Sequence, residues 1–194
     1  MEPIASVCVY CGARFGDDPV YKDAAETLGR EMAARSLELV FGGGNSGLMG
    51  AISDAARAAG GKVTGIIPRD LKQREIGGDS ETRLVVVDNM HERKMMMARL
   101  ADAFVVLPGG LGTLDETFEI VTWRQLGFHD KPIVIADIGG YWAPLRNAID
   151  SIVSHGFADP VDGVLLEWTE DIAGVFALLE RARPPSTPLD TRTI

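Results

Sequence analysis

The stretch Pro108-Gly109-Gly110-Leu111-Gly112-Thr113-Leu114-Asp115-Glu116 follows the apolar run Ala103–Leu107 and leads into Thr117–Trp123. We therefore expect a buried strand, a glycine-rich turn and a helix start in immediate succession. Glycine lets the backbone approach a ligand closely, and the N–H groups and positive dipole end of a new helix attract an anion. Because Glu116 lies beside this anion site, the stretch predicts phosphate binding next to an acid, as expected at a nucleotide-hydrolysing site.

The rest of the chain alternates apolar strand-like runs with amphipathic helical stretches, which is the pattern of an α/β fold with a parallel sheet. The predicted strands are Ser6–Tyr10, Leu37–Phe41, Val63–Ile67, Leu84–Val87, Phe104–Leu107, Ile133–Ala136 and Gly163–Leu166. The predicted helices are Pro19–Arg35, Leu48–Ala59, Met90–Leu100, Leu114–Leu126, Trp142–His155 and Ile172–Arg181. We expect one domain over residues 1–181 and a flexible tail over residues 182–194, which is rich in proline.

The composition limits the class of partner. The chain has 194 residues, 46% of them hydrophobic, and a formal net charge of −9, so a nucleic acid polymer would meet net repulsion. A small phosphate ligand stays compatible with this charge, because a local glycine loop and a few arginines outweigh the global sign. No apolar run approaches the ~20 residues that span a bilayer, and no secretory signal is recognisable. We therefore expect a cytoplasmic protein without membrane contact.

A second glycine loop precedes the first. Residues 42–47 match G-x-G-x-x-G between a predicted strand and a predicted helix, where Gly43 and Gly44 could cradle a phosphate. The alternative is that these glycines only allow tight strand-to-helix packing. The acidic residue that would hold the ribose of NAD is missing from the end of the next strand, which reads Ile66-Ile67-Pro68-Arg69. This disfavours an NAD-dependent oxidoreductase, and the absence of a G-x-x-x-x-G-K-[ST] motif disfavours a P-loop NTPase.

Two further features carry less information. Cys8 and Cys11 have C-x-x-C spacing, but residues three apart on a strand point to opposite faces, and no second ligand pair completes a metal site. The polar stretch from Arg69 to Arg83 is the longest irregular loop and follows a strand, so it should lie at the carboxyl edge of the sheet. The stretch from Arg69 to Arg83 is either a functional loop or a solvated surface loop.

Glu116 and Arg93 each have two interpretations. Thr113-x-x-Glu116 fits a capping box, in which both side chains satisfy backbone donors at the helix start. If Phe118 and Val121 face the core, Glu116 points away from the packed side. Helical spacing places Arg93 on one stripe with Met90, Met97 and Leu100, where a guanidinium needs a carboxylate or phosphate partner. Otherwise Arg93 extends to solvent at the sheet edge with its stem on the methionines.

The chain resembles the LOG family in three motifs: the loop Gly42–Gly50, the triplet Glu92-Arg93-Lys94 and the stretch Pro108–Glu116. Members of this family are cytokinin riboside 5′-monophosphate phosphoribohydrolases, often mislabelled lysine decarboxylases. The resemblance covers roughly residues 4–180 and includes the run from Thr122 to Pro132. It implies a Rossmann-like, doubly wound parallel sheet with helices on both faces, assembled as a homodimer.

The resemblance further implies hydrolysis of the N-glycosidic bond of a nucleoside 5′-monophosphate, with no metal or redox cofactor. The family's catalytic arginine and glutamate fall on Arg93 and Glu116. Its substrate- and phosphate-contacting positions fall on Glu75, Lys94, Gly110, Leu111, Gly112, Thr113, Leu114, Asp115 and Thr122. Gly109, in the same turn, is a further predicted phosphate-binding residue. The family usually has small hydroxyl residues after Cys-Gly, whereas here Ala13 and Arg14 follow. A phosphorylated-ligand carrier, like the molybdenum-cofactor carriers, is the alternative, and the preferred base stays open.

Overall fold

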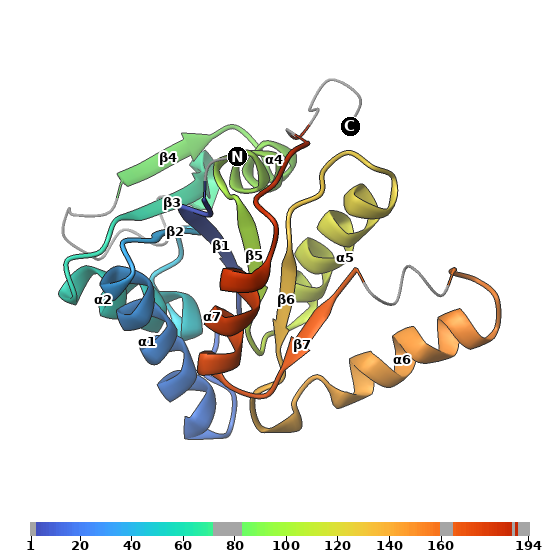
Figure 1. The fold of residues 1–194 in the computed structure, drawn as a ribbon. Helices are drawn as coiled ribbons and strands as arrows, with labels where there is room; N and C mark the ends of the chain where they lie inside the picture. Colours follow the sequence, from blue (N-terminus) through green and yellow to red (C-terminus); the bar gives the residue numbers. More distant parts are fainter. Residues whose placement is uncertain (1–2, 72–82, 160–164, 188, 190–194) are drawn as a thin grey trace.

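The computed structural model describes residues 3–71, 83–159, 165–187 and 189, which form a sheet between two layers of helices (Figure 1). The sheet has seven strands, all parallel, in the order β4-β3-β2-β1-β5-β6-β7. The strands are β1 Ser6–Tyr10, β2 Glu38–Phe41, β3 Val63–Pro68, β4 Arg83–Val87, β5 Ala103–Val106, β6 Ile133–Ala136 and β7 Glu167–Thr169. The predicted α/β class and the doubly wound parallel sheet are confirmed.

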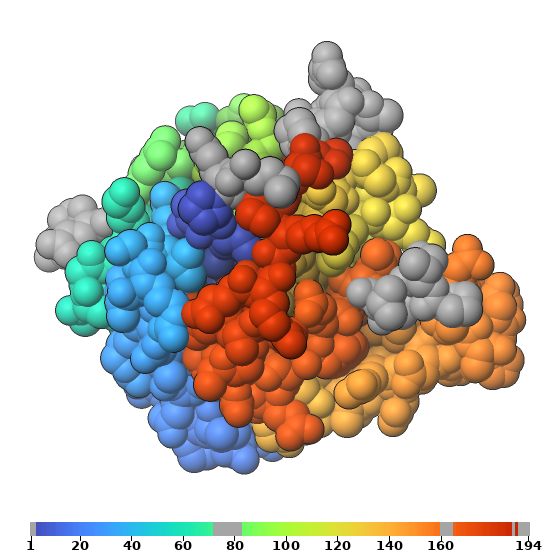
Figure 2. Space-filling view, viewed as in Figure 1, coloured from blue at the N-terminus to red at the C-terminus, as the bar shows by residue number. Residues whose placement is uncertain are grey.

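The helices divide between the two faces of the sheet. They are α1 Pro19–Ala34, α2 Gly47–Ala58, α4 Met90–Leu100, α5 Leu111–Gln125, α6 Ala143–Ser154 and α7 Ile172–Arg181, with a short 3₁₀ turn η1 Ile138–Gly140. Apolar side chains of α1, α2 and α7 pack on one face, and those of α4 and α5 pack on the other. Figure 2 shows the first of these faces, with α7 in the middle and α1 beside it. Among the helices that the structure describes, none is long and apolar enough to cross a membrane.

The central strand β1 supplies side chains to both cores. Val7, Val9 and Cys11 belong to the core under α1, α2 and α7, whereas Cys8 and Tyr10 belong to the core under α4 and α5. This alternation follows from the two-residue period of a strand. The expectation that Cys8 and Cys11 point to opposite faces is confirmed, and both are buried free thiols.

The last strand lies later in the chain than predicted. Of the predicted strand Gly163–Leu166, residues 163–164 lie outside the described residues, and residues 165–166 are not in a strand. The strand that pairs with β6 is β7, with Trp168 opposite Ile135. Leu166 is buried just before this strand and packs in the core under α4 and α5. Leu166 is therefore a core contact, and the residues that follow it form the edge strand.

Candidate active site

The pocket lies where the order of the strands reverses. The chain places β2, β3 and β4 on one side of β1 and then β5, β6 and β7 on the other. In open α/β sheets, ligands bind in the crevice outside the carboxyl ends of the strands at this point. Here the N–H of Gly12, after β1, donates to the carbonyl of Pro108, after β5, at 3.0 Å. A pocket of about 700 Å³ opens between the segments 11–17 and 108–113.

The glycine-rich turn after β5 leads directly into α5. The helix begins at Leu111, three residues earlier than predicted, with Gly110 as its N-cap residue and no side-chain capping hydrogen bond. The capping-box interpretation is therefore wrong: Thr113 lies inside the first turn, and its carbonyl accepts a hydrogen bond from the Thr117 hydroxyl at 2.7 Å. The first N–H groups of α5 border the pocket without a capping side chain, which is the arrangement that attracts an anion.

Glu116 lies one turn further along α5 and is only 8% exposed. It shares the buried face of the helix with Thr113, Thr117, Ile120 and Trp123. The assumption that Phe118 faces the core was wrong, because that side chain is 43% exposed, so the predicted outward direction of Glu116 was wrong too. Burial raises the pKa of Glu116 to about 7, although the nearby Arg93 opposes the shift. A carboxyl group with a pKa near neutrality suits proton transfer at physiological pH.

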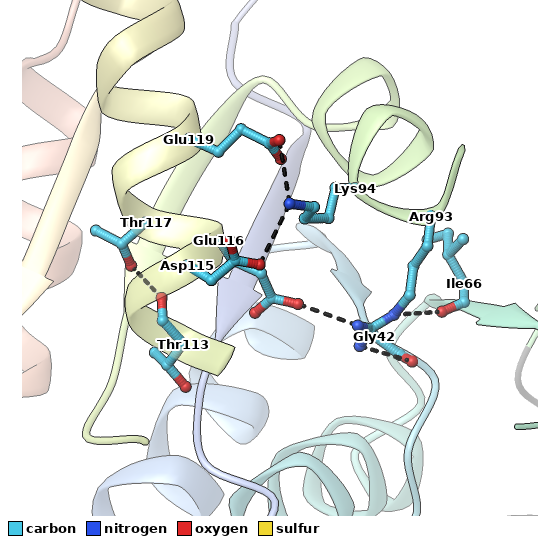
Figure 3. A network of polar contacts seen from close by, with 9 residues as sticks. All are labelled: Gly42, Ile66, Arg93, Lys94, Thr113, Asp115, Glu116, Thr117 and Glu119. Carbon is cyan, nitrogen blue, oxygen red and sulfur yellow. Dashed lines mark hydrogen bonds and ion pairs between the residues drawn. The ribbon is translucent and has the colours of Figure 1, made fainter. Parts of the chain in front are cut away.

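Arg93 connects three parts of the site (Figure 3). Its Nη1 lies 3.2 Å from Glu116 Oε1, its Nε donates to the Ile66 carbonyl at 3.2 Å, and its Nη2 donates to the Gly42 carbonyl at 3.2 Å. A Cβ atom on Gly42 would lie 1.8 Å from Nη2, so a larger residue at this position would displace the guanidinium. The predicted need for a carboxylate partner is met by Glu116, and Arg93 does not extend to solvent, because its side chain is only 11% exposed.

Lys94 ties α4 to α5 beside this pair (Figure 3). Its Nζ lies 3.2 Å from Asp115 Oδ2 and 3.1 Å from Glu119 Oε1. Burial lowers the pKa of Lys94, but the hydrogen bonds to Glu119 and Asp115 outweigh burial and raise it overall. These two ion pairs hold α4, which carries Arg93, next to α5, which carries Glu116.

The structure places only some of the predicted site residues at the pocket. Those that line it are Arg93, Glu116, Gly109, Gly110, Leu111, Gly112 and Thr113. Those that do not line it are Gly43, Gly44, Lys94, Leu114, Asp115 and Thr122. The exposed Thr122 hydroxyl instead donates to the Phe118 carbonyl. Glu75 lies outside the described residues, so its predicted role stays a prediction.

Sequence reasoning missed the aromatic side chains of the pocket. Tyr21 and Tyr141 both line it, and their rings meet edge to face with centroids 5.6 Å apart. The Tyr141 hydroxyl donates to the Gly109 carbonyl at 2.5 Å and so supports the glycine turn. Tyr141 follows Gly139-Gly140 just after β6, at the carboxyl edge of the sheet. That position was the signal that could have identified it.

The fold is that of a Rossmann-like protein. Its pocket, at the point where the strand order reverses, combines the uncapped start of α5 with the buried pair of Glu116 and Arg93. A family model described as "Possible lysine decarboxylase" matches residues 49–179. The chain belongs to this family, the LOG family of phosphoribohydrolases.

Individual relatives support this assignment. The probable cytokinin riboside 5′-monophosphate phosphoribohydrolase LOGL2 of Oryza sativa subsp. japonica is 48% identical over 79% of this chain, which spans 63% of that relative. The phosphoribohydrolase LOG7 of Arabidopsis thaliana is 46% identical over 97% of this chain and 87% of its own length.

Among solved structures, the Moco carrier protein of Chlamydomonas reinhardtii superposes with a TM-score of 0.65 at 20% identity, over 93% of this chain and 97% of that one. At this identity the likeness concerns the fold alone.

Proposed function

We propose that the protein hydrolyses the N-glycosidic bond of adenosine 5′-monophosphate and its N6-modified derivatives, releasing the free base and ribose 5-phosphate. The observation that carries the proposal is the buried ion pair of Glu116 with Arg93, one helical turn from the uncapped start of α5. The relatives named cytokinin riboside 5′-monophosphate phosphoribohydrolases support the same reaction.

In this reaction Glu116 acts on the sugar and on the attacking water. As the bond between C1′ and the base nitrogen breaks, positive charge develops on the ribose, and the carboxylate stabilises that charge. The same carboxylate accepts a proton from water as the water oxygen bonds to C1′. The electrons of the broken bond stay on the base, which leaves as the free base after it takes up a proton. A pKa of about 7 lets Glu116 accept a proton readily near neutral pH.

Arg93 is a positioning residue in this scheme. Its contacts with the Ile66 and Gly42 carbonyls fix the guanidinium, and the guanidinium in turn orients Glu116. The first turn of α5 binds the 5′-phosphate through backbone N–H groups. Binding energy from the phosphate thereby holds the reacting bond beside the carboxylate. The roles proposed for Glu75 and Thr122 rest on the family resemblance, and those for Gly43 and Gly44 rest on the glycine pattern alone.

The test is release of free base, followed by chromatography, from AMP and separately from isopentenyladenosine monophosphate. We expect release by the wild type and a loss of about 10²–10⁴-fold in Glu116→Gln, the range typical of a general acid–base group. Glu170→Gln is the matched control, because Glu170 is an exposed glutamate after β7, outside the pocket lining. Normal turnover by folded Glu116→Gln would refute the role of Glu116, and no release from either nucleotide by the wild type would refute the proposed function.

We also propose that the protein acts as a homodimer in the cytoplasm, with residues 1–181 as one domain and the rest as a tail. Exposed apolar side chains on the two helices flanking the site support an interface there: Met90 on α4 is 43% exposed and Phe118 on α5 is 43% exposed. Light scattering coupled to size exclusion tests the dimer, and a mass near 20.9 kDa would exclude it.

A further inference from the structure

The charges around the pocket are few, and most of them are already paired. Among the described residues that line it, the charged side chains are Arg14, Asp17, Arg93 and Glu116. Glu116 and Arg93 neutralise each other through their ion pair. A 5′-phosphate brings close to two negative charges at neutral pH, since its second pKa is near 6. The pocket of a protein with a net charge of −9 therefore needs a cation that is not already committed.

Arg93 is poorly suited to be that cation. Each of its three side-chain nitrogens already has a partner: the Ile66 carbonyl for Nε, the Gly42 carbonyl for Nη2 and Glu116 for Nη1. Moving the guanidinium to follow a phosphate would leave buried acceptors unpaired, which is unfavourable. Lys94 is also committed, because Asp115 and Glu119 hold its ammonium group outside the pocket lining.

Arg14 differs from both. Its side chain is exposed, lines the pocket and has no ion pair or hydrogen bond with any residue in the part of the chain that the structure describes. Its backbone, by contrast, is closely surrounded. Two residues earlier the N–H of Gly12 donates to the Pro108 carbonyl, and the Gly12 carbonyl accepts from the Leu48 N–H at 3.0 Å.

The start of α2 packs closely against the same turn, at Ala13 and Arg14. Gly47 has a positive φ of 58°, and a Cβ atom there would lie 2.3 Å from the backbone N of Arg14. Both the left-handed conformation and this close approach call for glycine. The turn after β1 is therefore held between α2 and the glycine turn that begins α5. Arg14 extends from the fixed backbone of this turn, and its guanidinium has no partner among the described residues.

We infer that Arg14 binds the 5′-phosphate of the substrate opposite the first turn of α5 and supplies the uncommitted positive charge of this site. The inference rests on the proposed function for the identity of the substrate. Arginine suits this task, because its planar guanidinium donates two parallel hydrogen bonds to phosphate oxygens.

The experiment compares Arg14→Gln, Arg14→Lys and the control Arg181→Gln, an exposed arginine at the end of α7. We measure KM and kcat for AMP and for adenosine, and the affinity for ribose 5-phosphate by calorimetry. Arg14→Gln should raise KM for AMP and weaken ribose 5-phosphate binding by about ten- to a hundredfold, the effect of losing a hydrogen bond to a charged group. Its kcat for AMP should change little, because the first turn of α5 still positions the phosphate and the Arg14 contact is the same in the ground and transition states. Its kcat/KM for adenosine should not change, because adenosine has no 5′-phosphate.

Arg14→Lys should fall between wild type and Arg14→Gln, and Arg181→Gln should match the wild type. Equal losses with AMP and adenosine, or no loss with AMP, would overturn the inference while leaving the proposed function intact. If the wild type releases no base, the proposed function fails; ribose 5-phosphate binding that depends on Arg14 would still support a phosphate contact. Ribose 5-phosphate binding that is the same in wild type and Arg14→Gln would overturn that contact as well.

Discussion

Replacing Glu116 with glutamine should change how the stability of the protein depends on pH. In the unfolded chain this carboxyl group ionises near its ordinary pKa of 4.5, whereas burial raises its pKa to about 7 in the folded protein. Between these values the folded state keeps a proton that the unfolded state has lost. The free energy of unfolding therefore falls as pH rises through this window, because the folded state binds more protons.

The size of the effect follows from the same two pKa values. Each pH unit in the window corresponds to about 1.4 kcal/mol, so Glu116 should lower the free energy of unfolding by ~3 kcal/mol between pH 4.5 and pH 7. The side chain is only 8% exposed, so solvent screens little of this effect. Glutamine has nearly the same shape and stays uncharged, so Glu116→Gln should lack this loss of stability.

The assay is urea denaturation of wild type and Glu116→Gln from pH 5 to pH 8 at one protein concentration, followed by circular dichroism. Titrations common to both proteins cancel in the difference between their free energies of unfolding. Between pH 5 and pH 8 that difference should shift by ~2.5 kcal/mol in favour of glutamine, because the range begins above pH 4.5, while Glu170→Gln shows a flat difference. A flat or opposite trend for Glu116→Gln would refute the reasoning, since it would mean that the ion pair with Arg93 keeps the carboxylate ionised throughout.

Three other perturbations test separate parts of the structure. If the ionised form of Glu116 is the active form, kcat/KM for AMP should rise with pH up to about 7 and then level off; a decline through this range would instead make Glu116 an acid. Gly42→Ala should displace Arg93, whose Nη2 lies 1.8 Å from the new Cβ, and lower kcat/KM at least ~100-fold with the fold retained by circular dichroism; normal kinetics would exclude positioning by Arg93. Lys131→Met should lower the free energy of unfolding by ~2–4 kcal/mol in urea, because the buried ammonium group donates to two carbonyls at the end of α4 at 2.7 and 2.6 Å; an unchanged value would show that water replaces those bonds.

Some parts of the fold and site follow from local sequence patterns. The strands of the sheet interior were predictable because each is a short run of apolar residues buried on both faces, such as β5. A partner carboxylate for Arg93 was predictable because an arginine on the apolar face of α4 is unfavourable without one. Both inferences depend only on neighbours in the sequence and on the energy of burial.

Other parts depend on contacts that no local pattern contains. The capping-box pattern predicted Thr113 as the N-cap and Leu114 as the first helical residue, yet Gly112 accepts helical dihedral angles and the helix begins at Leu111. The direction of Glu116 was predicted wrongly because apolar Phe118 is exposed while the carboxylate is buried against Arg93. Tyr141 reaches the pocket only because β6 ends beside β5, and this neighbour relation is a property of the sheet topology.

The contacts of Arg93 also have a consequence for folding. Its hydrogen bond to Gly42 spans 51 residues, and the one to Ile66 spans 27 residues, so the side chain joins segments that are distant along the chain. Such long-range contacts form late, because loop closure between distant segments loses chain entropy before the contacts compensate for it. The fixed guanidinium beside Glu116 therefore requires β2, β3 and α4 to have come together. In a refolding experiment, the recovery of base release should report the assembly of these three elements.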